Sequence, residues 1–219
     1  MRRLLALGVL VFVGSVGSAQ ATTVTFDDLG VSPPPPFNTL VFNGDLTASG
    51  FFFDMAGDPS VYQLANNSAN INNGTIYAVI EGDPLSQTTI SKVGGGAFAL
   101  ISLDYAKWQG PTIAAATITI TGNKVGGGTT APVILSPVGD FTSGGVGTDF
   151  QTFNSFGPEW GNLQSVVLRG SGASLGTLNY FAIDNIGVDV AATVPEPGTL
   201  SLLGLGSAYL IRRRQRNRC

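Results

Sequence analysis

Glycine and proline interrupt this chain so often that no segment keeps a 3.6-residue apolar period for three helical turns without one of them inside it. The 219 residues include 30 glycines and 12 prolines, and short glycine runs recur along the chain, for example at residues 94–96 and 126–128. Both residue types destabilise helix interiors and favour turns. Between residues 22 and 190 the sequence therefore excludes long helices and favours short strands joined by turns.

The segments between these interruptions alternate apolar and polar residues and are rich in β-branched and aromatic side chains. This pattern is typical of strands with one buried face. The predicted strands are 23–26, 75–80, 98–105, 117–121, 133–135, 149–153, 165–168 and 180–190. Many short strands at this spacing predict an all-β fold, an antiparallel β-sandwich or jelly roll, over residues 22–190. The segment 66–73, with five asparagines, is predicted to be a surface loop.

Residues 1–21 have the three parts of a secretory signal peptide. Two arginines follow Met1, an apolar run covers residues 4–13, and Ala19 and Ala21 supply the small residues that signal peptidase accepts. An N-terminal membrane anchor is the alternative, but the apolar run is about half the roughly 20 residues that a span needs. We expect an exported chain that begins at Thr22.

Residues 191–219 form a second signal. Pro195, Glu196 and Pro197 precede an apolar segment, residues 198–211, and a basic end that begins with Arg212, Arg213 and Arg214. A helix over 198–211 would be about 21 Å long, short for a bilayer core of about 30 Å. The arginines predict a cytoplasmic C-terminus. The two prolines favour an extended peptide outside the membrane, which suits a protease cleft.

This order of Pro-Glu-Pro, hydrophobic helix and arginines resembles the PEP-CTERM sorting signal. The resemblance implies recognition by an exosortase, an integral-membrane transpeptidase-like enzyme of Gram-negative bacteria that make extracellular polysaccharide. A membrane-anchored precursor would then be cleaved near the motif and transferred to the cell surface or the extracellular matrix. The alternative is a permanent single-span membrane protein with an extracytoplasmic binding domain, which would retain residues 200–219.

Charge is strongly segregated along the chain. Residues 22–194 contain thirteen of the fourteen acidic residues and only four basic ones, Lys92, Lys107, Lys124 and Arg169, so this part carries a net charge of −9. Binding to nucleic acid depends on clustered lysine and arginine. We therefore expect no nucleic-acid partner.

The residue types needed for most enzyme mechanisms are missing. The chain has no histidine, and its one cysteine is Cys219, which excludes a Ser-His-Asp triad, histidine-bound metals and an intramolecular disulfide. A glycosidase-like carboxylate pair would have to use Glu81 and Glu159. We rank a glycoside hydrolase below a non-enzymatic protein and assign no catalytic residue.

The opening segment 25–29 and the closing segment 181–188 resemble the jelly-roll domains of carbohydrate-binding modules. In that architecture an acid from each end often helps to hold a structural calcium, and the matching positions are Asp27 and Asp184. Calcium needs six to eight oxygen ligands, so backbone carbonyls and Asp28 or Asn185 would have to contribute. The alternative is that these acids cap turns and loop amides. No other cofactor is expected.

Sugar binding is the recognition function that the residues favour. Trp108 and Trp160 lie in polar, glycine-flanked segments and could stack on sugar rings, with Tyr62 and Tyr105 as weaker candidates. The alternative is that both indoles fill the ends of the sandwich. We expect a structural or glycan-binding protein of the extracellular matrix, with extracellular polysaccharide as its partner and signal peptidase and exosortase as processing enzymes.

Overall fold

The computed structural model describes residues 20–29, 39–42, 45–56, 62–66, 75–81, 87–108, 117–138, 150–171 and 180–190. All of them belong to one unit, Gln20–Val190. Every strand pair in these ranges is antiparallel. The described part of the chain is therefore all-β and antiparallel, which confirms the predicted fold class.

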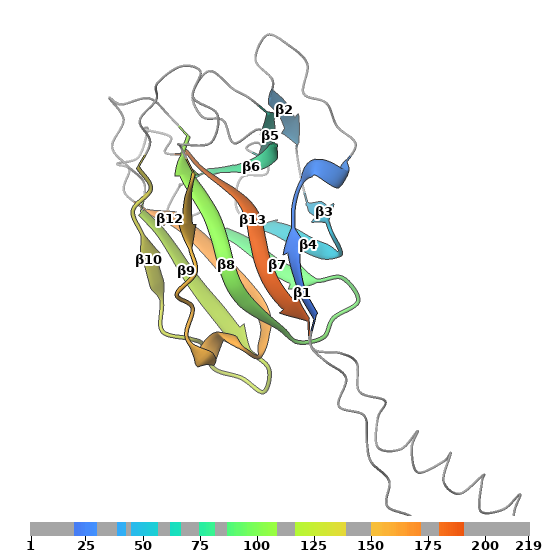
Figure 1. Cartoon of the computed structure of the whole chain (residues 1–219), viewed down its shortest axis with the longest axis vertical. Helices are drawn as coiled ribbons and strands as arrows, with labels where there is room; N and C mark the ends of the chain where they lie inside the picture. Colours follow the sequence, from blue (N-terminus) through green and yellow to red (C-terminus); the bar gives the residue numbers. More distant parts are fainter. Residues whose placement is uncertain are drawn as a thin grey trace, which may run out of the picture. The chain divides into compact units, whose positions relative to one another are not determined.

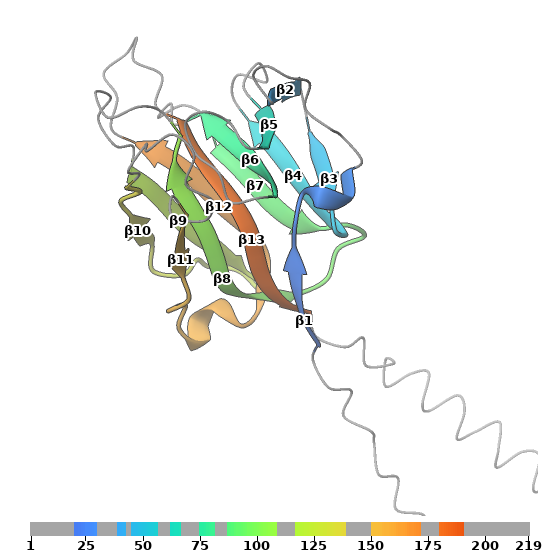
Figure 2. The ribbon, with the colours of Figure 1, turned by 45° about the horizontal axis from the view of Figure 1, so that its top comes forward.

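The strands form two layers (Figures 1 and 2). In the first layer the order is β2-β5-β6-β13-β8-β11, with β1 beside β13. Its strands are β1 (Gln20–Val24), β2 (Thr39–Phe42), β5 (Tyr62–Asn66), β6 (Ile76–Glu81), β8 (Phe98–Lys107), β11 (Gln151–Phe153) and β13 (Tyr180–Val190).

In the second layer the order is β3-β4-β7-β12-β9-β10. Its strands are β3 (Leu46–Ala48), β4 (Phe51–Ala56), β7 (Gln87–Lys92), β9 (Thr117–Lys124), β10 (Val133–Leu135) and β12 (Leu163–Ser171). Within the described ranges, the two layers are joined by strand pairing at one residue pair, Leu163 with Phe98. Two short 3-10 helices, η1 (Asp27–Leu29) and η3 (Pro158–Trp160), complete the described elements.

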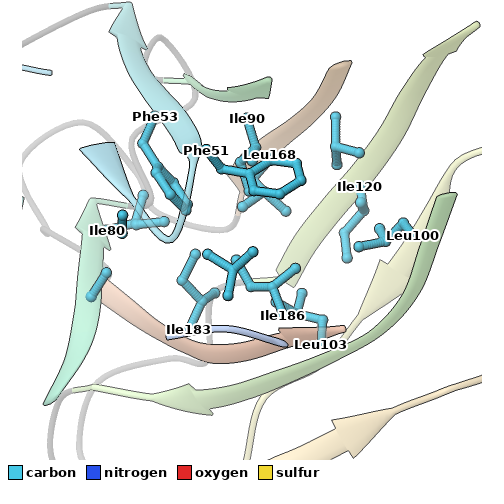
Figure 3. Packing of buried hydrophobic residues seen from close by; sticks show 14 of the residues in the cluster. Phe51, Phe53, Ile80, Ile90, Leu100, Leu103, Ile120, Leu168, Ile183 and Ile186 are labelled. Atoms are coloured by element: carbon cyan, nitrogen blue, oxygen red, sulfur yellow. The ribbon is translucent and has the colours of Figure 1, made fainter. Parts of the chain in front are cut away.

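The main hydrophobic core lies between the layers. Figure 3 shows Phe51, Phe53, Ile90, Leu168 and Ile120 of the second layer pointing toward side chains of the first layer. The first layer contributes Ile80, Leu100, Leu103, Ile183 and Ile186. These apolar residues share one face of their strands because side chains alternate along a strand. The sandwich is stabilised by the burial of this shared face.

The three phenylalanines Phe51 to Phe53 show that side chains of β4 alternate between the core and the outer face. Phe51 and Phe53 are buried in the core, whereas Phe52 is half-buried on the opposite face of β4. The Phe53 ring lies 5.3 Å from the ring of Phe26, and the Phe51 ring lies 5.2 Å from that of Phe98. Three consecutive phenylalanines of one strand therefore do not all face inward, because side chains alternate between the two faces.

One end of the sandwich contains both ends of the described chain. Gln20 pairs with Val190, Val190 pairs with Phe98, and Phe98 pairs with Leu163. We call this the terminal end, and it lies at the bottom of the ribbon in Figures 1 and 2. At the opposite, distal end Phe181 pairs with Lys107 and Tyr180 pairs with Glu81.

The two predicted signals lie almost entirely outside the described residues, as do the predicted helix over 198–211, Ala19 and most of the asparagine-rich loop. Ala21 is described and lies in β1. Among the described ranges, no helix is long and apolar enough to cross a membrane.

Candidate functional site

The outer face of the first layer carries a second apolar cluster, separate from the main core. Tyr77 and Val79 on β6 belong to it, whereas the intervening Ala78 and the following Ile80 face the main core. Because neighbouring residues of a strand point to opposite faces, Tyr77 and Val79 lie on the outside of the sandwich. Ala65 of β5 joins the same cluster.

Two alanines form the floor of this outer cluster. Ala182 of β13 pairs with Ala106 of β8, and both are fully buried. Large rings can lie over such small side chains. The Tyr77 ring lies 6.0 Å from the ring of Trp108 and 5.2 Å from that of Phe150.

We call the set Tyr77, Trp108, Phe150 and Tyr180 the aromatic face cluster. Its members do not have the same exposure. Tyr77 and Trp108 are buried, whereas Phe150 and Tyr180 remain half-buried at its border. The rings that retain accessible surface are therefore those of Phe150 and Tyr180.

A polar group adjoins the aromatic face cluster. Asp104 of β8 pairs with Thr152 of β11, two residues along from Phe150, and the Thr152 hydroxyl donates a 2.6 Å hydrogen bond to Asp104 Oδ1. The Asn185 amide donates a 2.9 Å bond to Asp104 Oδ2. Asp104 is thus a half-exposed carboxylate whose two oxygens are both oriented by neighbours.

The backbone of β13 is irregular next to Asp104. Its register against β8 shifts between Asp184 and Gly187, which marks a β-bulge. Within it Asn185 has φ 45°, a left-handed conformation that asparagine tolerates better than most residues. Glycine is favoured at position 187 because a Cβ there would meet the Ser102 hydroxyl oxygen, which would have to shift. The bulge lies where the Asn185 amide meets Asp104.

Neither tryptophan singled out from the sequence is exposed. Trp160 is 1% exposed and Trp108 is 8% exposed. The exposed ring faces expected for sugar stacking are therefore absent at both positions. Trp160 packs in the main core, whereas Trp108 is buried in the outer cluster. Tyr105 packs against the main core, and burial raises the pKa of its hydroxyl above the usual value. The side chain of Tyr62 is not among those that the structure describes.

The two glutamates that a hydrolase would need lie at opposite ends of the sandwich. Glu81 ends β6 at the distal end. Glu159 lies in η3, which leads through residues 161 and 162 to Leu163 at the terminal end. The ten residues of β8 that separate these ends span about 30 Å. Paired glycosidase carboxylates are only about 5–10 Å apart, so this arrangement does not support a Glu81–Glu159 pair.

The two acids proposed for calcium approach the same dipeptide. The Ile76 amide donates a 2.8 Å hydrogen bond to Asp27 Oδ1, and the Thr75 hydroxyl donates a 2.8 Å bond to Asp184 Oδ2. Asp184 is fully buried and Asp27 is exposed. The opening and closing segments are therefore linked through Thr75 and Ile76.

Asp28 and Asn185, the other two proposed calcium ligands, interact elsewhere. Asp28 accepts hydrogen bonds from the amide and hydroxyl of Ser49, at 3.3 and 3.2 Å, and Asn185 binds Asp104. The described residues contain no group of three or more acidic, histidine or cysteine side chains suited to a metal. Asp27 and Asp184 offer two carboxylates, fewer than calcium requires without several carbonyl ligands.

Calcium between Asp27 and Asp184 stays a prediction that chelation tests. If calcium is bound at about 100 times its Kd, its removal costs about 2.7 kcal/mol of folding free energy. For a chain of this size the Tm should then fall by roughly 5–10 °C in EDTA. Asp184→Asn should abolish the difference between calcium and EDTA, and Asp54→Asn, an exposed acid on β4, should preserve it. An identical Tm in calcium and EDTA would contradict the prediction.

Comparisons with known proteins identify the sorting signal. Residues 193–215 match the PEP-CTERM protein-sorting motif. The chain therefore carries this motif at the position where the sequence predicted it, although these residues lie outside the described structure. The motif implies export and processing by an exosortase. No curated protein sequence matches the chain.

Three solved structures illustrate the similarity of fold. A DUF4465 family protein from Bacteroides caccae is 15% identical, with 77% of this chain and 98% of that chain covered and a TM-score of 0.48. A family 29 carbohydrate-binding module from Piromyces equi is 13% identical (70% and 90% covered, TM-score 0.38). The K3 cleaved adhesin domain of Lys-gingipain from Porphyromonas gingivalis is 10% identical (77% and 98% covered, TM-score 0.39). At these TM-scores the likenesses indicate no function for this chain.

Proposed function

We propose that this chain is the precursor of an exported, non-enzymatic β-sandwich protein that an exosortase cleaves near Pro195, Glu196 and Pro197 and delivers to the cell surface or extracellular matrix. The match of residues 193–215 to the sorting motif is the observation that carries this proposal. The apolar segment 198–211 would hold the precursor in the membrane, with Arg212 to Arg214 on the cytoplasmic side.

The sandwich is assigned to the jelly-roll class. The strand order supports this assignment, because β6-β13-β8-β11 in one layer faces β7-β12-β9-β10 in the other. Consecutive strands from β6 to β9 alternate between the layers, as do β11, β12 and β13. This is the arrangement of an eight-stranded jelly roll, and the remaining strands extend its edges.

The role assigned to the sandwich is glycan recognition on the outer face of the first layer. The half-buried Phe150 lies two residues from Thr152 in a polar group formed by Asp104, Thr152 and Asn185, and the half-buried Tyr180 lies at the border of the same aromatic face cluster. Aromatic rings stack on sugar rings, while carboxylate and amide groups bind their hydroxyls. Asp104 is suited to this task because its neighbours already fix its orientation.

Binding to extracellular polysaccharide of the producing cells tests this role. Asp104→Asn retains the shape of the side chain but removes its charge, and we expect binding at least tenfold weaker, as for a lost hydrogen bond to a charged group. Phe150→Ala should weaken binding similarly. Thr121→Ser, on the outer face of the second layer, is the matched control and should bind normally. Saturable binding that is unchanged in Asp104→Asn and Phe150→Ala would refute the site.

A structural or adhesive role is the second candidate. It is favoured by the burial of Trp108 and Trp160, which removes the two most obvious sugar platforms. This role predicts self-association or retention at the cell surface without saturable glycan binding. The two candidates therefore differ in one measurable property of the same preparation.

A further inference from the structure

The sequence Lys-Val-Gly-Gly-Gly occurs twice in the chain, at residues 92–96 and 124–128. The two copies adopt the same turn. The Gly95 amide donates a 3.0 Å hydrogen bond to the Lys92 carbonyl, and the Gly127 amide donates a 3.1 Å bond to the Lys124 carbonyl. All six glycines have positive φ, which other residues rarely adopt. We call these segments the paired turns.

The paired turns flank a single strand. Ser165 of β12 pairs with Ser91 on one side and with Asn123 on the other, each one residue before a paired turn. Each turn also forms a backbone hydrogen bond with a residue of another segment. The Val93 amide donates to the Gly50 carbonyl at 2.9 Å, and the Val125 amide donates to the Asn162 carbonyl at 3.1 Å.

Their position is the terminal end of the sandwich. The first paired turn leads into Phe98, which pairs with Val190, the last described residue before the tail. The second begins at Lys124, which pairs with Leu163, and Leu163 pairs with Phe98. Adjacent strands lie about 4.8 Å apart. The paired turns and the point where the tail begins therefore lie within a few strand widths of one another.

The paired turns present apolar and basic groups together. Val93 is 51% exposed and Val125 is 47% exposed. Lys92 and Lys124 are two of the four basic residues in a part of the chain with net charge −9. Of the other two, Lys107 is buried at the distal end, and Arg169 donates to Gln87 on the second layer.

Three acids at this end are less favourable to an anionic partner. Glu159 is exposed on η3, and Asp189 is half-buried beside Val190. The exposed Asp28 binds Ser49, whose neighbour Gly50 accepts a hydrogen bond from Val93. None of the three belongs to the paired turns. Lysine side chains can extend their ammonium groups away from such neighbours, toward a surface beyond the valines.

We propose that the paired turns rest on anionic phospholipid headgroups while the precursor is held in the membrane by its tail. Val93 and Val125 would enter the interface, and Lys92 and Lys124 would bind lipid phosphates. This inference rests on the proposed tethering. Only residues 191–197 separate Val190 from the apolar segment, a reach of at most about 25 Å, so the terminal end is the part of the sandwich that the tail holds nearest the bilayer.

Lipid-resident quenching of single probes tests the proposal in the full chain. In a Cys219→Ser background, a fluorophore is attached to Val93→Cys, Val125→Cys or Val138→Cys, and each chain is reconstituted into phosphatidylcholine vesicles with phosphatidylglycerol and a spin-labelled lipid. Val138 is 59% exposed and lies at the distal end, beside Gln151, which makes it the matched control. We expect strong quenching at positions 93 and 125 and little at position 138.

The role of the lysines is tested with Lys92→Gln and Lys124→Gln. Each lysine near an anionic leaflet strengthens association about fivefold. The double variant should therefore lower the equilibrium constant for docking of the paired turns roughly 25-fold, and quenching at position 93 should decrease. Vesicles without phosphatidylglycerol should have a similar effect on the unaltered chain.

Vesicle flotation separates this inference from the proposed tethering. Chains that do not float with vesicles would overturn tethering and the inference together. Chains that float but show equal quenching at positions 93, 125 and 138 would overturn the inference alone. Quenching at positions 93 and 125 that does not respond to loss of both lysines and of phosphatidylglycerol would overturn the assignment of an anionic surface.

Discussion

Trp160→Ala is expected to lower the free energy of unfolding by about 3–5 kcal/mol, the range for removal of a buried large aromatic side chain. The Trp160 ring is 1% exposed and lies 4.8 Å from the ring of Phe156, which in turn lies 4.8 Å from the ring of Phe153. Alanine would leave a cavity next to Phe156. Urea unfolding measures the change, with circular dichroism as the signal.

The adjacent Glu159→Ala is the matched control for this variant. Glu159 belongs to the same short helix but is exposed, so its loss should change stability by less than about 0.5 kcal/mol. This comparison also guards against misinterpreting binding data, because a sugar-binding defect in Trp160→Ala would reflect loss of folded protein. A Trp160→Ala variant as stable as the unaltered chain would show that the indole is not part of the core.

Glu196→Ala is expected to block maturation of the tail while leaving export intact. Glu196 is the only acidic residue after Asp189, and it stands between two prolines, which favour an extended peptide. A protease cleft that recognises this peptide would lose its one charged contact. We expect the unprocessed precursor to become the predominant form, as measured by intact mass of the membrane fraction.

The control for the sorting variant is Asp54→Ala, an exposed acid on β4. It removes one negative charge from the exported part without touching the motif, and its tail should be processed normally. Normal maturation of Glu196→Ala would mean that the exosortase does not recognise this glutamate. Loss of export in that variant would mean that the substitution acts before the sorting step.

Strands with strong alternation could be predicted from the sequence. β9 and β13 carry β-branched and apolar residues at every second position over most of their length, and the segments predicted for them overlap the observed strands closely. Periodicity was sufficient there because one face is buried in the main core. The class of fold followed from these strands and from the turns between them.

Other strands have too little apolar-polar alternation to be predicted from the sequence. β7 has one apolar residue, Ile90, among glutamine, threonine, serine and lysine, and it forms a strand because it pairs with β4 on one side and β12 on the other. β3 has only three residues. Such strands are specified by their neighbours in the sheet rather than by their own pattern.

The candidate site depended on register, which a single sequence does not determine. Asp104 and Asn185 are 81 positions apart and meet only because β8 pairs with β13 and a bulge turns the asparagine. The burial of Trp108 likewise depends on Tyr77 lying across the Ala106–Ala182 pair. An aspartate at an outward position of a predicted strand was the one available signal for Asp104.

The intact mass of the native protein, from cells that contain the exosortase, tests the central claim most directly. The claim predicts a mature form that begins at Thr22 and lacks the apolar and basic segments, residues 198–219, because the enzyme cleaves near the Pro-Glu-Pro element. A stable product that extends from Thr22 to Cys219 in those cells would contradict it.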